Sequence, residues 1–402
     1  MPYRTLLLLA SFILMFVATG SLYMVAVALK EISTEMGWPR AVPSAAFSLQ
    51  FLGGGIGGIV MGWWLDRHNA TVPTVLSAIM IGIGAMLMAE VRTPWELYVI
   101  YAMMMGLFGR SALNVLLMAN VAGWDTEGGR SGVGVVFSGQ AVGGAVWPLI
   151  FQYSNESLGW RGTALWYGVA AIVLMLPLSL VFRRKMSTAT SAEPVYGTPA
   201  PYPTIGATRG QIMLCAAVMG CCTAMSLPLA HIVAYASDLD HDAARGAEML
   251  SVMLLAGAAS AFFLVGRAAQ RLGPLRALFV FSLVQMLSLM LLAANDGLVA
   301  LYAVSMLFGL GYGGILPCYP IIVRLLLPSS QAGRLTGVVL LFGGIGMALG
   351  SYIGGVSYDL VDSYRPAFLF CIAANFANLI LVVGLVRHTD AVLKKSTAQH
   401  LP

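Results

Sequence analysis

The sequence Gly62-Trp-Trp-Leu-Asp66-Arg67-His68-Asn69 separates two apolar stretches, and a related sequence, Gly266-Arg-Ala-Ala-Gln270-Arg271-Leu-Gly273, follows it after 204 residues. The same offset aligns glycines and arginines along both halves of the chain: Gly62 with Gly266, Arg67 with Arg271, Gly129 with Gly333, Arg130 with Arg334, Gly139 with Gly343, and Arg161 with Arg365. A constant offset through loops and apolar stretches alike indicates an internal repeat. We therefore expect two copies of one structural unit.

The composition is that of a membrane protein. Of the 402 residues, 59% are apolar and only 10% are charged, whereas about 25% of the residues of a soluble protein are charged. A soluble protein of this size would have too little polar surface to cover its core. The five cysteines all fall in apolar stretches and form no CxxC pair, so we expect buried thiols and no metal site.

Twelve apolar stretches are long enough to be transmembrane helices, because about 20 helical residues cross a hydrocarbon core of about 30 Å. They lie near 5–29, 44–64, 73–92, 95–121, 131–153, 163–182, 210–234, 248–269, 275–294, 298–324, 335–357 and 366–387. Strands of a membrane β-barrel would instead be short and alternate in polarity. We predict an all-α membrane protein with twelve transmembrane helices in two parallel six-helix repeats, related by an axis along the membrane normal.

A segment rich in Pro, Thr, Ser and Ala at 183–208 divides the twelve stretches six and six. Its composition predicts a flexible cytoplasmic linker. We therefore place the N-terminal six-helix half at 1–182, the C-terminal six-helix half at 209–390 and a cytoplasmic tail at 391–402.

The distribution of Lys and Arg predicts the orientation in the membrane. With both termini inside, the inner segments hold fifteen of these residues and the outer loops hold six; cytoplasmic loops carry the excess of positive charge. We expect cytoplasmic termini, and the short loops suit a bacterial inner membrane. Because the basic residues are scattered between apolar stretches, the net charge of +5 implies no nucleic-acid partner.

Arg110 is the one charged residue near the middle of an apolar stretch, while all seventeen acidic residues lie in loops, in the linker and tail, or at the ends of stretches. A charge at that depth costs about 2.5–3.5 kcal/mol on insertion scales, so it should face the protein interior or a wet cavity. We predict that Arg110 binds a carboxylate of an anionic substrate through two hydrogen bonds of its planar guanidinium. The alternative is a structural arginine that bonds to helix carbonyls.

Further polar residues in apolar stretches are candidates for the same substrate site. Asn114 lies one helical turn after the arginine, and Tyr23 of the first stretch can donate a hydrogen bond. His231, near the outer end of the seventh stretch, can titrate at physiological pH and couple proton movement; the alternative is a buried, satisfied histidine. Gln140 and Gln50 can complete the site or bond neighbouring helices to each other.

Charged residues of the predicted cytoplasmic loops form a candidate conformational gate. Asp66 can accept hydrogen bonds from the N-terminus of a facing helix, where the dipole favours negative charge, and so lock one conformation. Arg67 and its repeat Arg271 belong to the same loops. Arg130 and Arg334 begin the fifth and eleventh stretches as matched copies, and we assign them to this cytoplasmic network.

The sequence at 62–69 resembles the G-x-x-x-D-R/K-x-G loop of the major facilitator superfamily, although the second copy carries Gln270 in place of the acid. The resemblance covers essentially the whole chain. It implies a carrier that works by alternating access, functions as a monomer and needs no cofactor. A membrane enzyme would need a constellation such as HExxH or paired intramembrane aspartates, and the sequence has neither, so we expect no enzyme.

A finer resemblance is to the bacterial monocarboxylate porters and oxalate/formate antiporters. It rests on Met36-Gly37-Trp38-Pro39-Arg40, on Gly139, Gly143 and Pro148 of the fifth stretch, and on Pro228-Leu-Ala-His231-Ile-Val-Ala-Tyr235. The chain departs from that branch at 260–266, where monocarboxylate porters usually carry an arginine and this sequence has none. The resemblance implies a small organic anion, such as a monocarboxylate, as substrate, with H+ as a candidate coupled ion. The alternative is an efflux carrier for hydrophobic or drug-like compounds.

Overall fold

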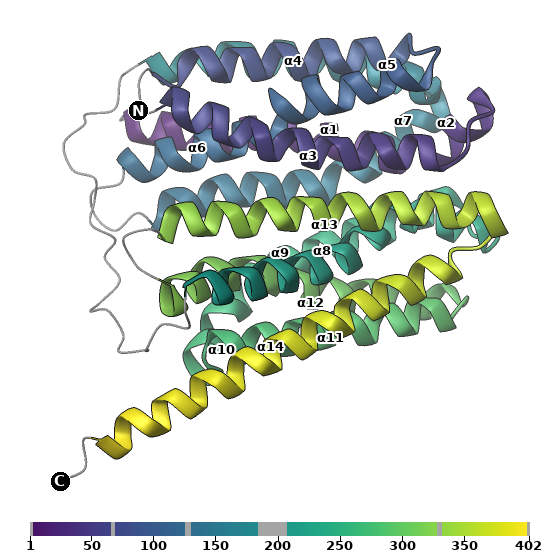
Figure 1. Ribbon diagram of the computed structural model, residues 1–402. Helices are drawn as coiled ribbons and strands as arrows, with labels where there is room; N and C mark the ends of the chain where they lie inside the picture. Colours follow the sequence, from purple (N-terminus) through teal and green to yellow (C-terminus); the bar gives the residue numbers. More distant parts are fainter. Residues whose placement is uncertain (1–2, 66–68, 125–129, 184–206, 328–331, 400–402) are drawn as a thin grey trace. The chain divides into compact units, whose positions relative to one another are not determined.

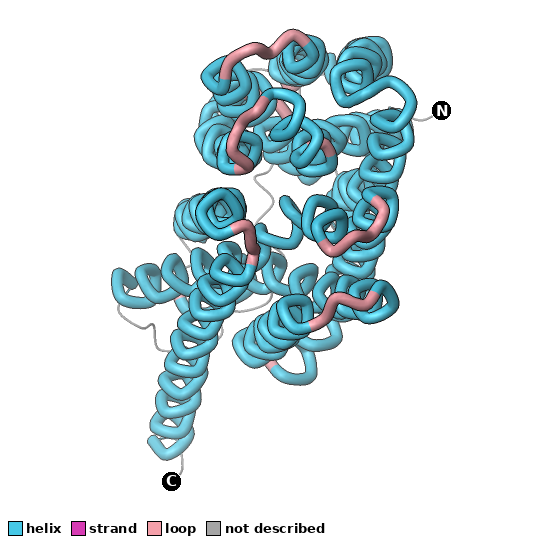
Figure 2. The backbone as a smooth tube through the Cα atoms, turned by 90° about the vertical axis from the view of Figure 1, so that its right-hand side faces the viewer, coloured by secondary structure: helices cyan, strands magenta, loops and turns pink. Residues whose placement is uncertain are grey.

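The computed structural model describes residues 3–65, 69–124, 130–183, 207–327 and 332–399 (Figure 1). These residues are almost entirely helical, with no strand among them, and short loops join successive helices (Figure 2). The helices are α1 (Tyr3–Val27), α2 (Leu29–Met36), α3 (Ala41–Leu65), α4 (Thr71–Ala89), α5 (Pro94–Val99), η1 (Ile100–Leu107), α6 (Arg110–Trp124), α7 (Arg130–Ser179), η2 (Leu180–Arg183), α8 (Ala207–Asp238), α9 (Ala243–Ala259), η3 (Ser260–Leu264), α10 (Val265–Leu272), α11 (Pro274–Ala294), α12 (Leu298–Leu326), α13 (Ala332–Val361) and α14 (Arg365–Gln399). The prediction of an all-α fold is confirmed.

Within the described ranges, eleven helical runs are long and apolar enough to cross a membrane. One of them, Gly134–Arg183, has 50 residues, more than twice the length that a span needs. The backbone at Gly159 leaves the helical region there, with φ of 68°, a conformation that glycine adopts without steric cost. The run is therefore two spans that meet at Gly159, and the count agrees with the twelve predicted stretches.

Short sequence signals set the end of α2 and the start of α5. Gly37 ends α2 in the left-handed region, with φ of 64°, as glycine does at many helix C-termini. At the start of α5, the Thr93 side chain accepts from the backbone N–H of Glu96, and the Glu96 side chain accepts from the backbone of Thr93. This capping box satisfies two backbone donors at the helix start.

Two compact units divide the chain. Unit 1 is 1–195 with two pieces of the second half of the sequence, 228–251 and 351–363; unit 2 holds the remaining residues. The C-terminal part of α8, the start of α9 and the end of α13 therefore pack with first-half helices in unit 1. This division does not test the predicted bounds of the two halves, the linker and the tail, which stay predictions; the described helix α14 continues into the predicted tail as far as Gln399.

Glycines bring α1 and α7 into backbone contact in unit 1. A Cβ atom added at Gly143 would lie 2.6 Å from the carbonyl oxygen of Phe16, and one added at Gly139 would collide with the carbonyl oxygen of Phe12. Small residues at such positions let membrane helices approach closely and gain dispersion energy that lipid cannot replace. The glycine pattern of the fifth apolar stretch thus positions α7, which carries Gln140, against α1, which carries Tyr23.

Candidate functional site

Arg110 begins α6, separated by two residues from the end of a π-helical segment, η1, that interrupts the fourth span. Its residue surface is only 7% exposed. The guanidinium lies within electrostatic range of two phenol hydroxyls, those of Tyr23 on α1 and Tyr167 on α7. Tyr167 donates to the backbone oxygen of Val17 at 2.6 Å, which anchors α7 to α1 beside this group.

Asn114 and Gln140 are joined by a hydrogen bond. The Asn114 Nδ2 atom donates to Gln140 Oε1 at 3.3 Å, and this links α6 to α7. The Asn114 Oδ1 atom is buried, with no hydrogen-bond partner among the described residues. Such an acceptor can take a hydrogen bond from a substrate or from a water molecule, since a buried acceptor left unsatisfied costs about 1–3 kcal/mol.

Four of the predicted substrate residues thus lie together. Tyr23 from α1, Arg110 and Asn114 from α6, and Gln140 from α7 form a group that we call the Arg110 site. Tyr23 and Arg110 are buried, and Asn114 and Gln140 are partly buried. Gln50 of α3 connects α3 to α1, because its Nε2 atom donates to Ser21 Oγ at 3.3 Å. The side chains described around the guanidinium are neutral hydrogen-bonding groups, so the arrangement suits a small anion that also carries polar groups.

His231 lies in a different set of contacts. Its Nε2 atom is 2.7 Å from the backbone oxygen of Ser351 on α13 and 3.5 Å from Ser44 Oγ on α3. Ser351 Oγ lies 2.6 Å from Ser48 Oγ on the same helix α3. The buried histidine therefore belongs to a polar contact between first-half and second-half segments of unit 1.

The main group that sequence reasoning missed lies in the predicted outer loops. It consists of four charged residues and one tyrosine, and we call it the outer latch: Lys30, Arg40, Asp238, Asp359 and Tyr358. Both terminal nitrogens of Arg40 bond to the Asp238 carboxylate, one of them at 2.9 Å, and Lys30 Nζ lies 2.9 Å from the same carboxylate. The guanidinium also stacks 3.5 Å from the centroid of the Tyr358 ring, a cation–π contact.

Asp359 completes the latch through backbone bonds. Its Oδ1 atom accepts from the backbone N–H of Arg40 at 2.7 Å, and its Oδ2 atom accepts from that of Ala41 at 2.8 Å. The carboxylate therefore caps the N-terminus of α3, where unpaired donors and the helix dipole favour negative charge. All these contacts fall within unit 1 and join residues of the first half to the segments 228–251 and 351–363.

The predicted cytoplasmic gate is described only in part. Asp66 and Arg67 lie outside the described residues. Arg130 and Arg334 lie in the first turns of α7 and α13, but their side chains are not described, and Arg271 is exposed in the last turn of α10. The gate remains a prediction.

Two further expectations concern metals and thiols. In the part of the chain that the structure describes, no three His, Cys, Asp or Glu side chains are grouped so as to hold a metal ion. All five cysteines are free thiols and buried, in agreement with their positions in apolar stretches.

The chain is similar to known transporters over nearly its whole length. The Major Facilitator Superfamily model matches residues 11–209 and 212–401. An uncharacterized MFS-type transporter, YcxA of Bacillus subtilis, is 23% identical over 365 residues, which are 89% of this chain and 88% of that protein. The agnestins efflux protein AgnL12 of Paecilomyces divaricatus is 25% identical over 354 residues, 84% of this chain and 75% of that protein.

Solved structures show the same fold. The crystal structure of the nucleoside transporter NupG superposes with a TM-score of 0.76 at 12% sequence identity and covers 96% of this chain and 99% of its own. At such low identity the likeness concerns the fold alone. It agrees with the two parallel six-helix repeats expected from the sequence.

Proposed function

The chain belongs to the major facilitator superfamily, and we propose that it is a secondary active transporter that moves a small organic anion across the membrane by alternating access. The family and the fold are those of multi-pass membrane transporters. The finer assignment concerns the substrate, and it rests on the Arg110 site.

One observation carries the proposal: an arginine residue that is 7% exposed lies in a membrane span, grouped with the neutral side chains of Tyr23, Asn114 and Gln140. A buried cation in a membrane protein marks an ion or substrate pathway by default. The planar fork of arginine matches a carboxylate in two hydrogen bonds. The phenol and the two amides then supply neutral hydrogen bonds that orient the rest of a small molecule.

The outer latch supports the alternating-access part of the proposal. It joins first-half residues to second-half residues at the predicted outer surface. Its ion pairs must therefore break before the substrate site can open to that side. A carrier needs contacts of this kind to be only moderately strong, because both conformations must be populated. A carboxylate shared between Arg40 and Lys30 fits a contact that can be released in steps.

Several finer expectations accompany the proposal. We assign the substrate to the monocarboxylate class, with cotransport of H+ as one coupling mode and anion exchange or uniport as the others. We also propose a monomer in a bacterial inner membrane, with both termini in the cytoplasm, as the distribution of Lys and Arg predicts.

A second candidate function is efflux of hydrophobic or drug-like compounds. The observation that favours it is the relative from Paecilomyces divaricatus, whose name describes an efflux protein. In this case the Arg110 site would hold a structural arginine, and the neutral and aromatic groups around it would line the path of an uncharged compound.

Thermal stabilisation of the purified protein separates the two functions. A panel of mono- and dicarboxylates is tested with the native protein, Arg110→Ala and Arg110→Lys. We expect one carboxylate to raise the Tm of the native protein, to fail with Arg110→Ala and to act weakly with Arg110→Lys, whose ammonium lacks the planar fork. Equal stabilisation of native protein and Arg110→Ala would remove Arg110 from the site.

Transport in proteoliposomes then completes the test. The stabilising carboxylate should be taken up by vesicles that contain the native protein and not by those that contain Arg110→Ala. If no carboxylate stabilises or is transported, while hydrophobic compounds are extruded, the efflux function replaces the anion function.

A further inference from the structure

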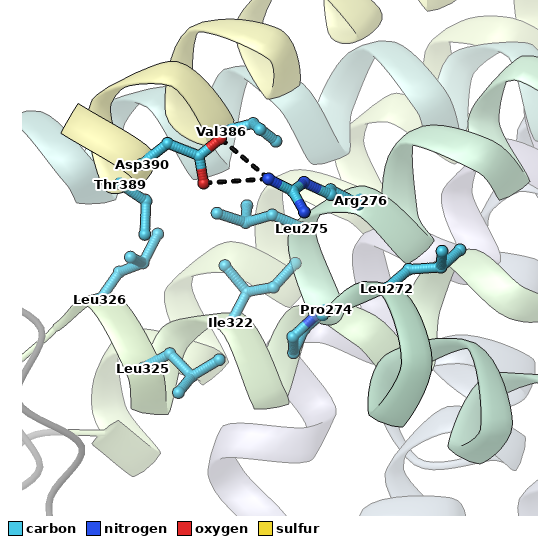
Figure 3. Close-up of a pocket in the computed structure, with 11 residues that line it drawn as sticks. Leu272, Pro274, Leu275, Arg276, Ile322, Leu325, Leu326, Val386, Thr389 and Asp390 are labelled. Atoms are coloured by element: carbon cyan, nitrogen blue, oxygen red, sulfur yellow. Dashed lines mark hydrogen bonds and ion pairs between the residues drawn. The ribbon is translucent and has the colours of Figure 1, made fainter. Parts of the chain in front are cut away.

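A small cavity of about 170 Å³ lies in unit 2, at the predicted cytoplasmic ends of α11, α12 and α14 (Figure 3). Apolar side chains form its walls, among them Leu275, Ile322, Leu325 and Val386, and Arg276 and Asp390 face each other at one side. We call it the Arg276 pocket. The cavity is independent of the Arg110 site, which lies wholly in unit 1.

The chain segments that line the pocket carry more basic than acidic residues. Arg276 Nη2 bonds to both oxygens of Asp390, at 3.2 and 3.0 Å. Asp390 is the only acidic residue of α10, α11, α12 and α14. Three more exposed arginines, Arg271, Arg324 and Arg387, are chain neighbours of residues that line the pocket. Close to the lining residues in sequence there are thus four arginines and one carboxylate, and the carboxylate bonds to Arg276.

The size of the cavity limits what it can take. Pockets for drug-sized ligands measure about 300–1,000 Å³, so a cavity of about 170 Å³ admits only part of such a molecule. A larger ligand can place only its polar group in the cavity, and the rest of the ligand must lie outside it. A lipid satisfies this condition, because its headgroup and its acyl chains occupy different depths of the bilayer.

We propose that the Arg276 pocket binds the phosphate and glycerol of an anionic phospholipid of the cytoplasmic leaflet. The phosphate replaces the Asp390 carboxylate as the partner of Arg276, since both anions accept two hydrogen bonds from one guanidinium fork. The leucine and isoleucine side chains contact the glycerol and the first methylene groups. The other arginines attract the negative surface of the leaflet, a contribution of the kind that basic residues near membranes make.

This assignment predicts opposite effects for the two members of one ion pair. Arg276→Gln and Asp390→Asn both remove the same salt bridge. Only Arg276→Gln removes the cation that holds the phosphate, whereas Asp390→Asn frees Arg276 from its competitor. If the pair served only to connect α11 to α14, both substitutions would act in the same direction.

The experiment compares the Tm of the purified full-length protein in detergent micelles doped with phosphatidylglycerol, doped with phosphatidylcholine, or supplied with inorganic phosphate alone. Native mass spectrometry counts the bound lipids. We expect phosphatidylglycerol to stabilise the native protein. The affinity for phosphatidylglycerol should fall about fivefold in Arg276→Gln, the effect of one basic residue near an anionic lipid. It should rise in Asp390→Asn. The matched control is the exposed pair Arg245 and Glu248, joined at 3.0 Å within α9, where Arg245→Gln should leave lipid affinity unchanged.

Several results would overturn the proposal. Equal loss of affinity in Arg276→Gln and Asp390→Asn would assign the ion pair a structural role alone. Equal stabilisation by phosphatidylcholine would show that the headgroup charge is not recognised, and equal stabilisation by inorganic phosphate would show a free-anion site. If a variant fails to fold, the salt dependence of the native protein still tests the proposal. Its binding of phosphatidylglycerol must weaken as added salt screens the arginines.

Discussion

Breaking the outer latch from its two sides should have unequal effects, and the difference follows from the contacts of Asp238. In Arg40→Gln the carboxylate keeps Lys30, 2.9 Å away. In Asp238→Asn both cations lose their common partner, and the Arg40 side chain, 8% exposed, keeps its stacking on Tyr358 but no carboxylate from Asp238. A buried charge that loses its partner costs about 3–5 kcal/mol.

We therefore expect Asp238→Asn to destabilise the closed latch by about 3 kcal/mol, the lower end of that range, because Lys30 can turn to solvent. Arg40→Gln should cost about 2 kcal/mol, since it removes hydrogen bonds to a charged group while leaving that group paired. By the relation of tenfold per 1.4 kcal/mol, the closed population relative to the open one falls about 30-fold in Arg40→Gln and more in Asp238→Asn.

Disulfide formation measures this population directly. Ser48 Oγ and Ser351 Oγ lie 2.6 Å apart, so cysteines at both positions place their sulfurs near the S–S bond length of about 2.05 Å. The cross-linking rate of the pair Ser48→Cys and Ser351→Cys should fall in Arg40→Gln and fall further in Asp238→Asn. Ser48→Cys alone controls for reaction with the five buried native thiols. Unchanged rates in both variants would refute the reasoning, and so would a larger effect of Arg40→Gln.

Two further predictions concern a half-buried acid and a helix contact. Burial, and then the charges of Glu156 and Glu35, raise the pKa of Glu31 above 4.5, so its ionised form destabilises the fold at neutral pH and the penalty disappears below that ordinary pKa. Glu31→Gln should thus raise the Tm at pH 7 by the equivalent of less than about 1 kcal/mol, since solvent screens the site, with no gain near pH 4; a gain that is the same at both pH values would contradict this. Gly143→Ala should cost about 1–3 kcal/mol by overpacking α1 against α7, whereas Gly134→Ala on the same helix, where an added Cβ meets nothing within 4 Å, should not lower the Tm.

The fold could be predicted from the sequence because a bilayer imposes one simple requirement, an apolar run of sufficient length. That requirement found all twelve stretches, including the two that the structure joins through Gly159. The π-helical segment η1 was not predicted, because the residues Ile100–Leu107 have no pattern that distinguishes one helical hydrogen-bond register from another. Its extra residue per turn depends on packing.

The site could be predicted only where a single residue was exceptional in its surroundings. Arg110 was identified as a charge in an apolar stretch, and Asn114 followed from helical spacing. The latch could not be found in this way, because Arg40 and Asp238 are ordinary loop charges in the sequence. Their pairing spans 198 residues and exists only once the helices are packed.

The hydrogen bonds of Asp359 have a consequence for which substitutions the protein can accept during evolution. Both described bonds end on backbone N–H groups, at Arg40 and Ala41, and almost any amino acid supplies such a donor. Replacement of the side chains at these two positions therefore leaves the contact in place, with proline as the exception because it has no N–H. The interaction depends on the side chain of Asp359 alone and on no side chain at 40 or 41. A search for correlated substitutions across related sequences would therefore not detect it. Among substitutions at these three positions, only that of Asp359, or a proline at 40 or 41, removes these two bonds.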